Sequence, residues 1–452
     1  MVHLDHDGPW LAPAGVIAGV CLGWALQISN GFLNERALAL VALAFALFFA
    51  AVLLPRVAGP AAASGAPFLR TLAVIGLALQ VTLLATSSPA MYLRADEAAR
   101  QTFTAGVAAL GLVGAAILWS ARGWRFGILL AGLVAIHFAL GVWILRHSPN
   151  PAIDVHLFHR YAIDALRSGE NPYAITFPDI YRTGDFYGPG LSIDGRLQFG
   201  FPYFPLTLLI SVPGQVFGKD PRFAQLATME VAAILMACAR PRGFGPLAAV
   251  LYLTSPRIFF VLEQSWTEPI VVFGLAVVTV AACRWTRAVP FLFGAFVALK
   301  QYLVFALPAA CLLVGAPIRW RRVVVLLAKG AAVGGAITLP FVLWNPAAFW
   351  KSVVALQFHQ PFRGDALSVL AWWAAQGHPP PSSAVAFAVA AAAAGLAAWR
   401  LPRTAAGFSA AVAATFFAFF ATNKQAFCNY YFFVVGALFV TVSAVRPPER
   451  RA

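Results

Sequence analysis

Long apolar runs separated by short polar connections occupy almost the whole chain. Many of these runs approach the length of about 20 residues that an α-helix needs to cross a hydrocarbon core about 30 Å thick. A soluble protein could not bury so many runs in one core, so the pattern predicts an all-α polytopic membrane protein with about fourteen transmembrane helices. The predicted spans are residues 11–28, 37–54, 70–88, 104–120, 126–145, 222–239, 244–261, 269–283, 288–299, 302–316, 323–343, 382–400, 405–421 and 429–445.

The composition supports this class of protein. Of the 452 residues, 61% are hydrophobic and only 11% are charged, and the mean hydropathy is +0.77. The formal net charge of +15 would fit nucleic acid only if the basic residues formed one stripe. They stand instead in pairs at the ends of apolar runs, which favours anchoring among membrane lipids and no nucleic-acid partner. The five cysteines lie in or beside apolar runs without a CxxC pair, so we expect no metal site.

Basic residues fall at alternate connections between the predicted spans. The positive-inside rule assigns these connections and both termini to the cytoplasmic side. The membrane itself is expected to be the plasma membrane. The first ten residues contain no Lys or Arg, so we expect no signal peptide, and the first run, about Leu11 to Ile28, should remain as a helix. The residues that set this orientation are Arg56, Arg70, Arg122, Arg125, Arg240, Arg242, Arg284, Arg287, Arg319, Arg321, Arg322, Arg400, Arg403, Arg446, Arg450 and Arg451.

One apolar stretch, Tyr203–Phe217, is not predicted to cross the membrane. Counting it as a span would put Arg240 and every later basic pair up to Arg403 outside. The stretch is also short and interrupted by Pro205 and Pro213. We therefore expect an interfacial or re-entrant helix.

The consequence is a long first outer loop, residues 146–222, that holds seven of the seventeen acidic residues. The inner connections are short and nearly free of acidic residues, so the polar chemistry is expected on the extracytoplasmic side. The seven acidic residues are Asp154, Asp164, Glu170, Asp179, Asp185, Asp194 and Asp220.

Asp154 stands at the head of a predicted amphipathic juxtamembrane helix. From Val155, the apolar residues Phe158, Ala162 and Leu166 recur at helical spacing, and polar residues occupy the other positions. One interpretation is structural: the Asp154 carboxylate caps the helix by accepting a backbone N–H. The other is catalytic: a carboxylate held at the membrane surface acts as a general base. The two are compatible, because a cap also fixes the side chain.

At this point the chain resembles a known superfamily. An acid shortly after a span, an amphipathic helix, the NPY element at 171–173 and the segment FGFPYFPL at 199–206 are similar to the first outer loop of GT-C glycosyltransferases. The layout is most similar to the polyprenyl-phosphate-mannose-dependent mannosyltransferase-like branch. The resemblance covers residues 126–445. It implies a four-helix N-terminal extension, residues 1–125, followed by a GT-C-like catalytic domain, residues 126–452.

The resemblance also implies an activity. Such an enzyme transfers a mannose-like hexose or a pentose from a polyprenyl-phosphate donor to a hydroxyl of a lipid or glycan acceptor, with inversion. Asp154 matches the position of the family's catalytic base. Members use cationic groups near the membrane to stabilise the departing phosphate, and many need no metal, so no cofactor is expected.

Four side chains are candidates for contact with the donor phosphate: Lys300, Arg363, His359 and Lys424. Cations around a departing phosphate lower the barrier, most strongly where water is scarce. Each has an ordinary alternative. Lys300 reaches the interface with its ammonium group, and Arg363 and Lys424 fit solvated loop residues equally well. His359 is the weakest candidate, because a lone histidine in a loop is usually just solvated.

Two glutamates, Glu263 and Glu268, flank the turn EQSWTEP between two predicted spans. Glu268 is a candidate for binding a sugar hydroxyl. Alternatively, either glutamate pairs with Lys300, or both lie in an exposed turn. Trp266, between them, is a candidate for stacking on a sugar face.

Two other functions stay open from the sequence. A lipid-linked-sugar flippase or secondary transporter would need ionisable residues near the membrane midplane, and only Glu230 and Lys329 qualify clearly. A lipid-linked polymer ligase would share the chemistry of the outer loop.

Overall fold

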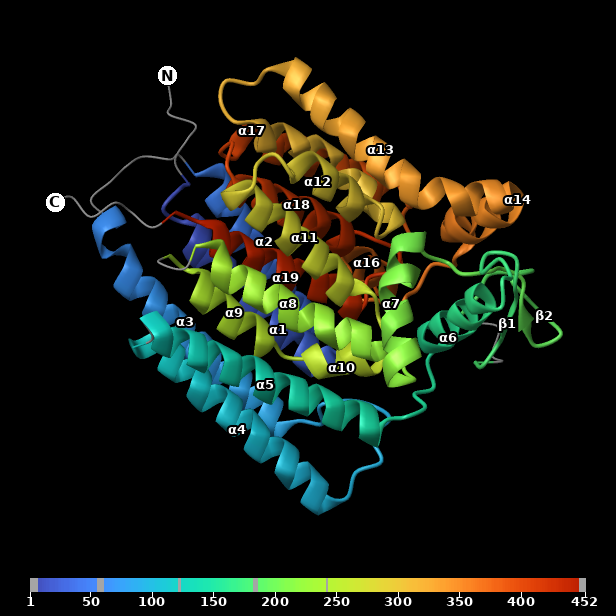
Figure 1. Ribbon diagram of the computed structural model, residues 1–452, viewed down its shortest axis with the longest axis horizontal. Helices are drawn as coiled ribbons and strands as arrows, with labels where there is room; N and C mark the ends of the chain where they lie inside the picture. Colours follow the sequence, from blue (N-terminus) through green and yellow to red (C-terminus); the bar gives the residue numbers. More distant parts are fainter. Residues whose placement is uncertain (1–6, 55–60, 121–122, 182–185, 241–242, 447–452) are drawn as a thin grey trace.

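The computed structural model describes residues 7–54, 61–120, 123–181, 186–240 and 243–446, and these are mostly helical (Figure 1). The helices are α1 (Leu11–Ser29), α2 (Glu35–Leu53), α3 (Ala61–Thr86), α4 (Glu97–Ser120), α5 (Gly123–His147), α6 (Asp154–Arg167), α7 (Pro205–Gly218), α8 (Arg222–Ala239), α9 (Gly245–Leu253), α10 (Ile258–Glu263), α11 (Glu268–Arg284), α12 (Val289–Val297), η1 (Gln301–Val314), α13 (Trp320–Trp344), α14 (Pro346–Phe349), η2 (Trp350–Ala355), α15 (Leu356–His359), α16 (Val369–Ala375), α17 (Ala384–Arg400), α18 (Ala405–Ala421) and α19 (Cys428–Ala444). A small antiparallel sheet, in the order β1-β3-β2, consists of β1 (Phe177–Pro178), β2 (Ser192–Ile193) and β3 (Arg196–Leu197).

Seven of the described helices are long and apolar enough to cross a membrane. The other predicted spans coincide with shorter helices. The architecture is therefore that of an all-α membrane protein, and the count of fourteen spans stays a prediction. The seven segments are Leu11–Ser29, Glu35–Leu53, Pro67–Thr86, Glu97–Trp119, Gly123–His147, Arg222–Ala239 and Trp320–Trp344.

Two predicted spans are not continuous α-helices. The span at 244–261 is broken between α9 and α10, where Pro256 lacks an N–H and Arg257 has a left-handed backbone with φ 65°. The span at 302–316 is η1, a run of 3₁₀ turns with Pro308 inside it. Apolar residues fill both segments, so hydropathy alone does not reveal these changes in the backbone.

The four N-terminal helices share a hydrophobic core with the rest of the chain. Helix α1 packs closely on α19, because a Cβ at Gly19 would meet the Phe439 ring at 2.8 Å. Within the described residues, the segment predicted as an extension thus has no separate core. The division at residue 125 itself stays a prediction.

The beginning and the end of the chain lie at one end of the bundle. The Asp7 carboxylate accepts the Thr404 hydroxyl at 2.6 Å and the Arg446 backbone N–H at 2.9 Å. At the same end, Arg240 Nε donates to the Ala444 carbonyl at 2.9 Å. This grouping agrees with the predicted clustering of basic residues on one side, while the side of the membrane stays a prediction. Arg56, Arg122, Arg242, Arg450, Arg451 and Asp185 lie outside the described residues.

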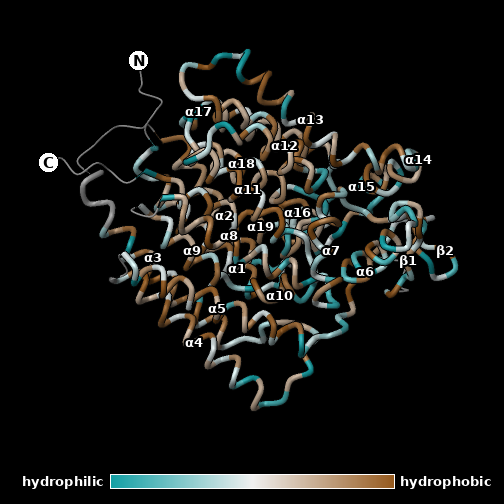
Figure 2. The backbone as a smooth tube through the Cα atoms, viewed as in Figure 1, coloured by the Kyte–Doolittle hydropathy of each residue, from teal (hydrophilic) through white to brown (hydrophobic). Residues whose placement is uncertain are grey.

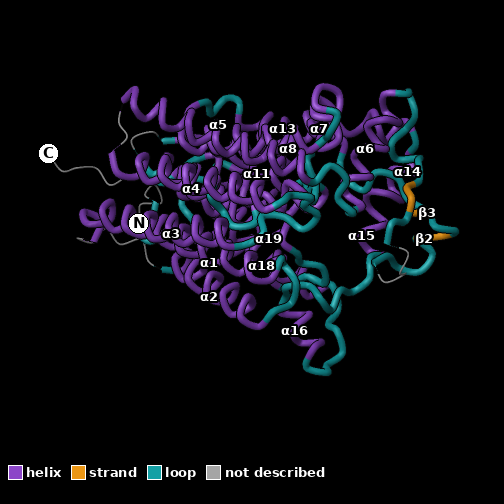
Figure 3. The backbone as a smooth tube through the Cα atoms, turned by 90° about the horizontal axis from the view of Figure 1, so that it is seen from below, coloured by secondary structure: helices purple, strands orange, loops and turns teal. Residues whose placement is uncertain are grey.

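The residues between α5 and α8 form an outer cap (residues 148–221) at the opposite end of the bundle (Figure 1). Hydrophilic residues are concentrated there, whereas brown, hydrophobic residues dominate the bundle (Figure 2). In the second view, the strands, α6, α14 and α15 lie together beyond the ends of α18 and α19 (Figure 3).

The amphipathic helix predicted at the head of this cap is confirmed as α6. Its buried residues Val155, Phe158 and Ala162 face inward, and the last two join a second hydrophobic cluster with Phe349 and Val353 from the chain after α13. Burial of this apolar face holds α6 against the bundle. The cap is therefore a packed unit that can position side chains accurately.

The stretch predicted not to cross is helix α7. It lies across, rather than along, the direction of α5 and α8 in Figure 1. Pro205 occupies its first turn, where a missing N–H costs nothing. This orientation agrees with an interfacial helix.

Candidate functional site

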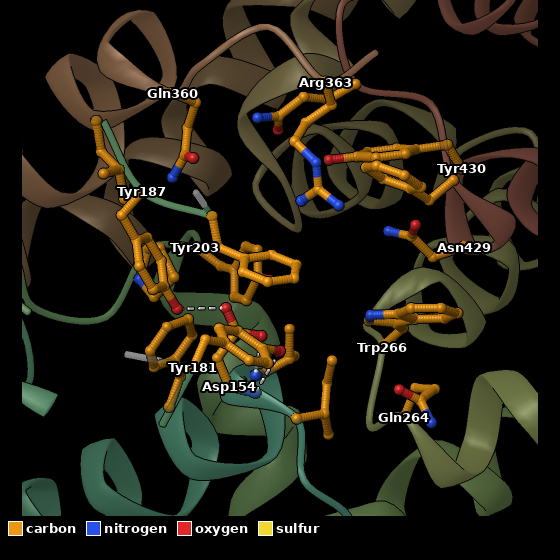
Figure 4. Close-up of a pocket in the computed structure, with 18 of the residues that line it drawn as sticks. Asp154, Tyr181, Tyr187, Tyr203, Gln264, Trp266, Gln360, Arg363, Asn429 and Tyr430 are labelled. Atoms are coloured by element: carbon orange, nitrogen blue, oxygen red, sulfur yellow. Dashed lines mark hydrogen bonds between the residues drawn. The ribbon is translucent and has the colours of Figure 1, made fainter. Parts of the chain in front are cut away.

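A cavity of about 330 Å³ lies between the outer cap and the adjacent ends of the helices (Figure 4). Its walls come from segments far apart in the sequence: the α1–α2 turn, the loop before α4, the start of α6, the outer cap, the α10–α11 turn, the segment around α15, and the start of α19. Such a site cannot be assembled without the complete fold.

The lining combines aromatic rings with carboxamides and very few charges. Asp154 is the one carboxylate and Arg363 the one cationic side chain among the described residues that line the cavity, and Figure 4 shows them on opposite sides. Aromatic faces pack against apolar surfaces, and carboxamides both donate and accept hydrogen bonds, which suits a neutral, hydroxyl-rich ligand. The carboxamides are Asn30, Gln264, Gln357, Gln360, Gln425 and Asn429.

Both oxygens of the Asp154 carboxylate are held by short hydrogen bonds. Oδ1 accepts the Val155 backbone N–H at 2.7 Å, and Oδ2 accepts the Tyr187 hydroxyl at 2.7 Å. The Asp154 N–H in turn donates to the Tyr181 hydroxyl at 3.3 Å. Helix α6 begins at Asp154 itself, with Ile153 at the capping position. The prediction that Asp154 caps the helix is therefore wrong, because Ile153 holds that position and makes no side-chain cap bond. The Asp154 carboxylate bonds to the backbone of the first turn and lines the cavity, which is compatible with the catalytic interpretation.

The surroundings of Asp154 suit a general base. Burial raises the pKa of its carboxyl above the ordinary value, and the hydrogen bonds from Tyr187 and Val155 oppose that rise. A carboxylate with a raised pKa accepts a proton more readily than an exposed one. Burial, followed by the Asp154 charge, also raises the pKa of Tyr187, which therefore remains a hydrogen-bond donor at neutral pH.

The Tyr187→Phe variant tests this arrangement. It removes one hydrogen bond to the ionised carboxylate, so the pKa of Asp154 should rise further and the acidic limb of the pH–rate profile should move to higher pH. If Asp154 acts as a general base, the turnover rate at neutral pH should fall about tenfold. Tyr161→Phe is the control, because Tyr161 belongs to the same cap but is exposed and does not line the cavity. An unmoved acidic limb in Tyr187→Phe would contradict the role of this bond.

Arg363 lies between aromatic rings and one acidic partner. Its guanidinium stacks on Phe186 at 4.6 Å and on Phe427 at 4.8 Å. Nε and Nη2 donate to Asp365 at 2.8 and 2.7 Å. Nη1 makes no hydrogen bond among the described residues. The guanidinium therefore keeps N–H groups that can donate to an anion. Of the four cations predicted for the donor phosphate, Arg363 is the one that lines the cavity.

Lys300 and Glu268 lie behind the cavity wall and form an ion pair. Both are buried, and Lys300 Nζ donates to the Glu268 carboxylate and, at 2.8 Å, to the Thr267 hydroxyl. Nζ also lies 4.9 Å from the centre of the Tyr203 ring and 5.7 Å from that of Tyr430. Since these two tyrosines line the cavity and Lys300 and Glu268 do not, the pair supports the wall. The pairing alternative is confirmed, and direct contact with a donor stays a prediction.

His359 and Lys424 are not among the lining residues either. His359 is exposed, and its Nδ1 is 2.8 Å from the Ala355 carbonyl of its own helix. Lys424 Nζ donates to the Gln360 carbonyl at 2.5 Å, and partial burial lowers the pKa of its ammonium group. Lys424 thus holds the backbone of Gln360, whose side chain does line the cavity.

The expectation of an exposed turn around Glu263 and Glu268 is wrong. Both side chains have 0% exposure, because α10 and α11 are packed inside the bundle. Glu263 accepts the backbone N–H groups of Met91 and Tyr92 at 2.6 and 2.8 Å. Trp266, between the two glutamates, lines the cavity as a stacking residue would.

Sequence reasoning missed the outer-loop tyrosines and the carboxamides of the site. One signal was present: Tyr181, Tyr187 and Tyr203 belong to the unusually aromatic half of the outer loop. The carboxamides gave no comparable signal, because isolated Gln and Asn residues in loops are ordinary. Only their convergence on one cavity distinguishes them.

No group of three or more His, Cys, Asp or Glu side chains within the described residues is arranged to hold a metal ion. Comparison with known proteins gives no further guide to the site, since no family model, curated protein or solved structure matches the chain.

Proposed function

We propose that the protein is an integral membrane glycosyltransferase of GT-C type. It transfers a mannose-like hexose or a pentose from a polyprenyl-phosphate donor to an acceptor hydroxyl on the extracytoplasmic side. The observation that carries this proposal is the Asp154 carboxylate, oriented by Tyr187 in a cavity of aromatic and carboxamide side chains with Arg363 opposite.

The reaction is a single displacement. Asp154 takes the proton of the acceptor hydroxyl while the acceptor oxygen forms a bond to the anomeric carbon of the sugar. The bond between that carbon and the phosphate oxygen breaks, and the lipid phosphate leaves with the electron pair. Attack from the face opposite the leaving group inverts the anomeric configuration. The carboxylate can accept the proton, because each oxygen has a second lone-pair direction besides its hydrogen bond.

Arg363 is the group best suited to the departing phosphate. The negative charge that develops on the leaving oxygen is stabilised by a fixed cation in a site with little water. Phe186 and Phe427 restrict the guanidinium, so little reorganisation is needed when the charge appears. Asp365 accepts hydrogen bonds from the same guanidinium but is more exposed than Arg363. Solvent therefore limits how far Asp365 neutralises the Arg363 charge.

An apolar groove supports a lipid-borne donor. It measures about 480 Å³ and is lined by α12, α13 and η1, with Phe204 at one margin. The preceding residue, Tyr203, lines the polar cavity, so neighbouring residues of one segment face the two spaces. Gly294 and Gly330 let α12 and α13 approach closely, whereas Gly335 leaves room in the groove. A long isoprenoid chain fits the almost entirely apolar lining.

A side chain that fills the groove should weaken the binding of long-chain donors and leave the binding of short-chain donors unchanged. In Gly335→Leu, the new side chain occupies the groove, and the KM for a long polyprenyl donor is expected to rise about tenfold. A donor with a short isoprenoid chain should keep its KM. Gly395→Leu is the matched control, because Gly395 lies in α17, away from the groove, and no heavy atom lies within 4 Å of an added Cβ there. An equal rise in KM for long and short donors would argue against a lipid in this groove.

The proposal is tested with purified protein in lipid nanodiscs. Radiolabelled polyprenyl-phosphate hexoses and pentoses are offered with a panel of lipid and glycan acceptors, and product stereochemistry is read by NMR. Transfer with inversion is expected for at least one pair. Movement of the lipid-linked sugar across vesicles without any transfer would favour the flippase alternative and overturn the proposal.

A further inference from the structure

The four N-terminal helices contribute two loops to the cavity. The α1–α2 turn supplies Asn30 and Phe32, and the loop before α4 supplies Met91 and Tyr92. No role for these helices was predicted from the sequence. Their contribution to the lining raises the question of which substrate they contact.

The loop before α4 is fixed beside Asp154. The Tyr92 hydroxyl donates to the Ala152 carbonyl at 3.0 Å, two residues before Asp154. Burial raises the pKa of Tyr92, with further contributions from Glu263 and Asp154. Met91, its neighbour, is 49% exposed although it lines the cavity. An aromatic ring and a thioether thus line the cavity on a loop that is bonded to the chain two residues before the proposed base.

The two ends of helix α10 supply the residues that hold this loop. Glu263, at the end of α10, accepts the N–H groups of Met91 and Tyr92. Arg257, at the start of α10, donates to the Ser88 carbonyl at 2.8 Å and to the Gln27 carbonyl at 3.1 Å. The buried Glu263 carboxylate thus has backbone donors for both of its oxygens and fixes the backbone of Met91 and Tyr92.

The α1–α2 turn is fixed at the other side, beside the segment that carries Arg363. Phe32 forms a β-bridge with Ala366, and the Leu33 N–H donates to the Asp365 carbonyl at 2.7 Å. Gly31 has φ 82°, and a Cβ there would lie 2.0 Å from the Cys428 nitrogen, so only glycine fits. This turn therefore supports the phosphate side, whereas Met91 and Tyr92 stand on the side of the base.

We propose that Met91 and Tyr92 form the acceptor-binding wall of the cavity and select acceptors that present an apolar ring face next to the reacting hydroxyl. The inference rests on the proposed function, because the acceptor hydroxyl must approach Asp154 for its proton to be removed. A pyranose ring or another ring with a C–H face stacks on Tyr92, and Met91 adapts to its edge. Glu263 is the positioning residue for both.

The test separates the KM of the acceptor from that of the donor. Met91→Ala and Tyr92→Ala are assayed in nanodiscs with the radiolabelled donor and the best acceptor found for the wild-type chain. We expect the acceptor KM to rise about tenfold while the donor KM is unchanged, because the lost contacts are on the acceptor side. Arg94→Ala is the control in the same loop, since Arg94 is exposed and does not line the cavity. Met91→Ala breaks no side-chain hydrogen bond, so it still tests the proposal if Tyr92→Ala misfolds.

The possible results are distinguishable. A raised donor KM, or acceptor kinetics equal to those of Arg94→Ala in both variants, would overturn the acceptor wall while leaving the glycosyltransferase intact. A wild-type protein that transfers no sugar from any donor would overturn the proposed function, and this inference would fall with it.

Discussion

Asp154→Asn should reduce sugar transfer about a thousandfold without loss of stability. The amide has nearly the shape of the carboxylate and still accepts the Val155 N–H, but it cannot take a proton from the acceptor. The acceptor oxygen then attacks while still protonated, which is why the rate rather than the binding should suffer. The variant is assayed at saturating donor and acceptor, and its melting temperature is measured in the same detergent.

The pKa of Asp154 predicts the direction of the stability change. Burial raises this pKa in the folded protein, so the contribution of the group to stability is present below the pKa of the unfolded chain and is lost as pH rises through the folded value. At neutral pH the ionised side chain therefore lowers stability relative to a neutral one. Asp154→Asn should be at least as stable as the wild type at pH 7, and this advantage should disappear in acid.

A matched control comes from the same outer cap. Asp194 is exposed in the β2–β3 turn with φ 49°, a left-handed conformation that asparagine tolerates. Asp194→Asn removes the same charge from the cap and should transfer sugar at the wild-type rate. If Asp154→Asn also transfers at the normal rate while folded, Asp154 serves only the helix and the proposed mechanism fails.

Lys300→Met should destabilise the protein by about 3–5 kcal/mol, because it leaves the buried Glu268 carboxylate without its partner. The double variant Lys300→Met, Glu268→Leu replaces both charged side chains by apolar ones and should recover most of the lost stability. Replacing a buried ion pair by well-packed apolar groups often leaves stability unchanged. Unfolding is followed by chemical denaturation in detergent micelles. Lys351→Met is the control, because that lysine is exposed.

The same pair of variants separates support from direct donor contact. If Lys300 acts through the cavity wall, the stable double variant should keep the donor KM within about threefold of wild type, since Tyr203 and Tyr430 remain in place. If Lys300 touches the donor phosphate, the double variant should fold normally and lose transfer. That result would restore the role predicted for Lys300 from the sequence.

Much of the fold was predictable because a bilayer imposes one-dimensional rules. Apolar runs must be helical, since no water is present to satisfy their backbone groups. The amphipathic helix at Asp154–Arg167 followed from periodicity, and the short separate helix at Pro205–Gly218 from its length and the distribution of basic residues. The broken helix at Pro256 and the 3₁₀ run of η1 were missed, because both are as apolar as continuous helices.

In the candidate site, too, residues in local sequence patterns were predictable, whereas those brought together by packing were not. Asp154 was predictable because its position after a span and before an amphipathic helix is a local pattern. The burial of Glu263 and its bonds to Met91 and Tyr92 were not, because they join residues more than 170 positions apart. The distinction between Arg363, which lines the cavity, and Lys424, which does not, likewise depends on packing.

The sequence by itself determined that this is an all-α membrane protein with a polar outer cap headed by Asp154, because hydropathy and helical periodicity act on neighbouring residues. Only the tertiary structure decided which side chains share the cavity: it paired Lys300 with Glu268 behind the wall, set Arg363 opposite Asp154, and brought two N-terminal loops to the cavity. The physical reason is that these contacts are made between helices by close packing and buried hydrogen bonds, which depend on the arrangement of the whole bundle.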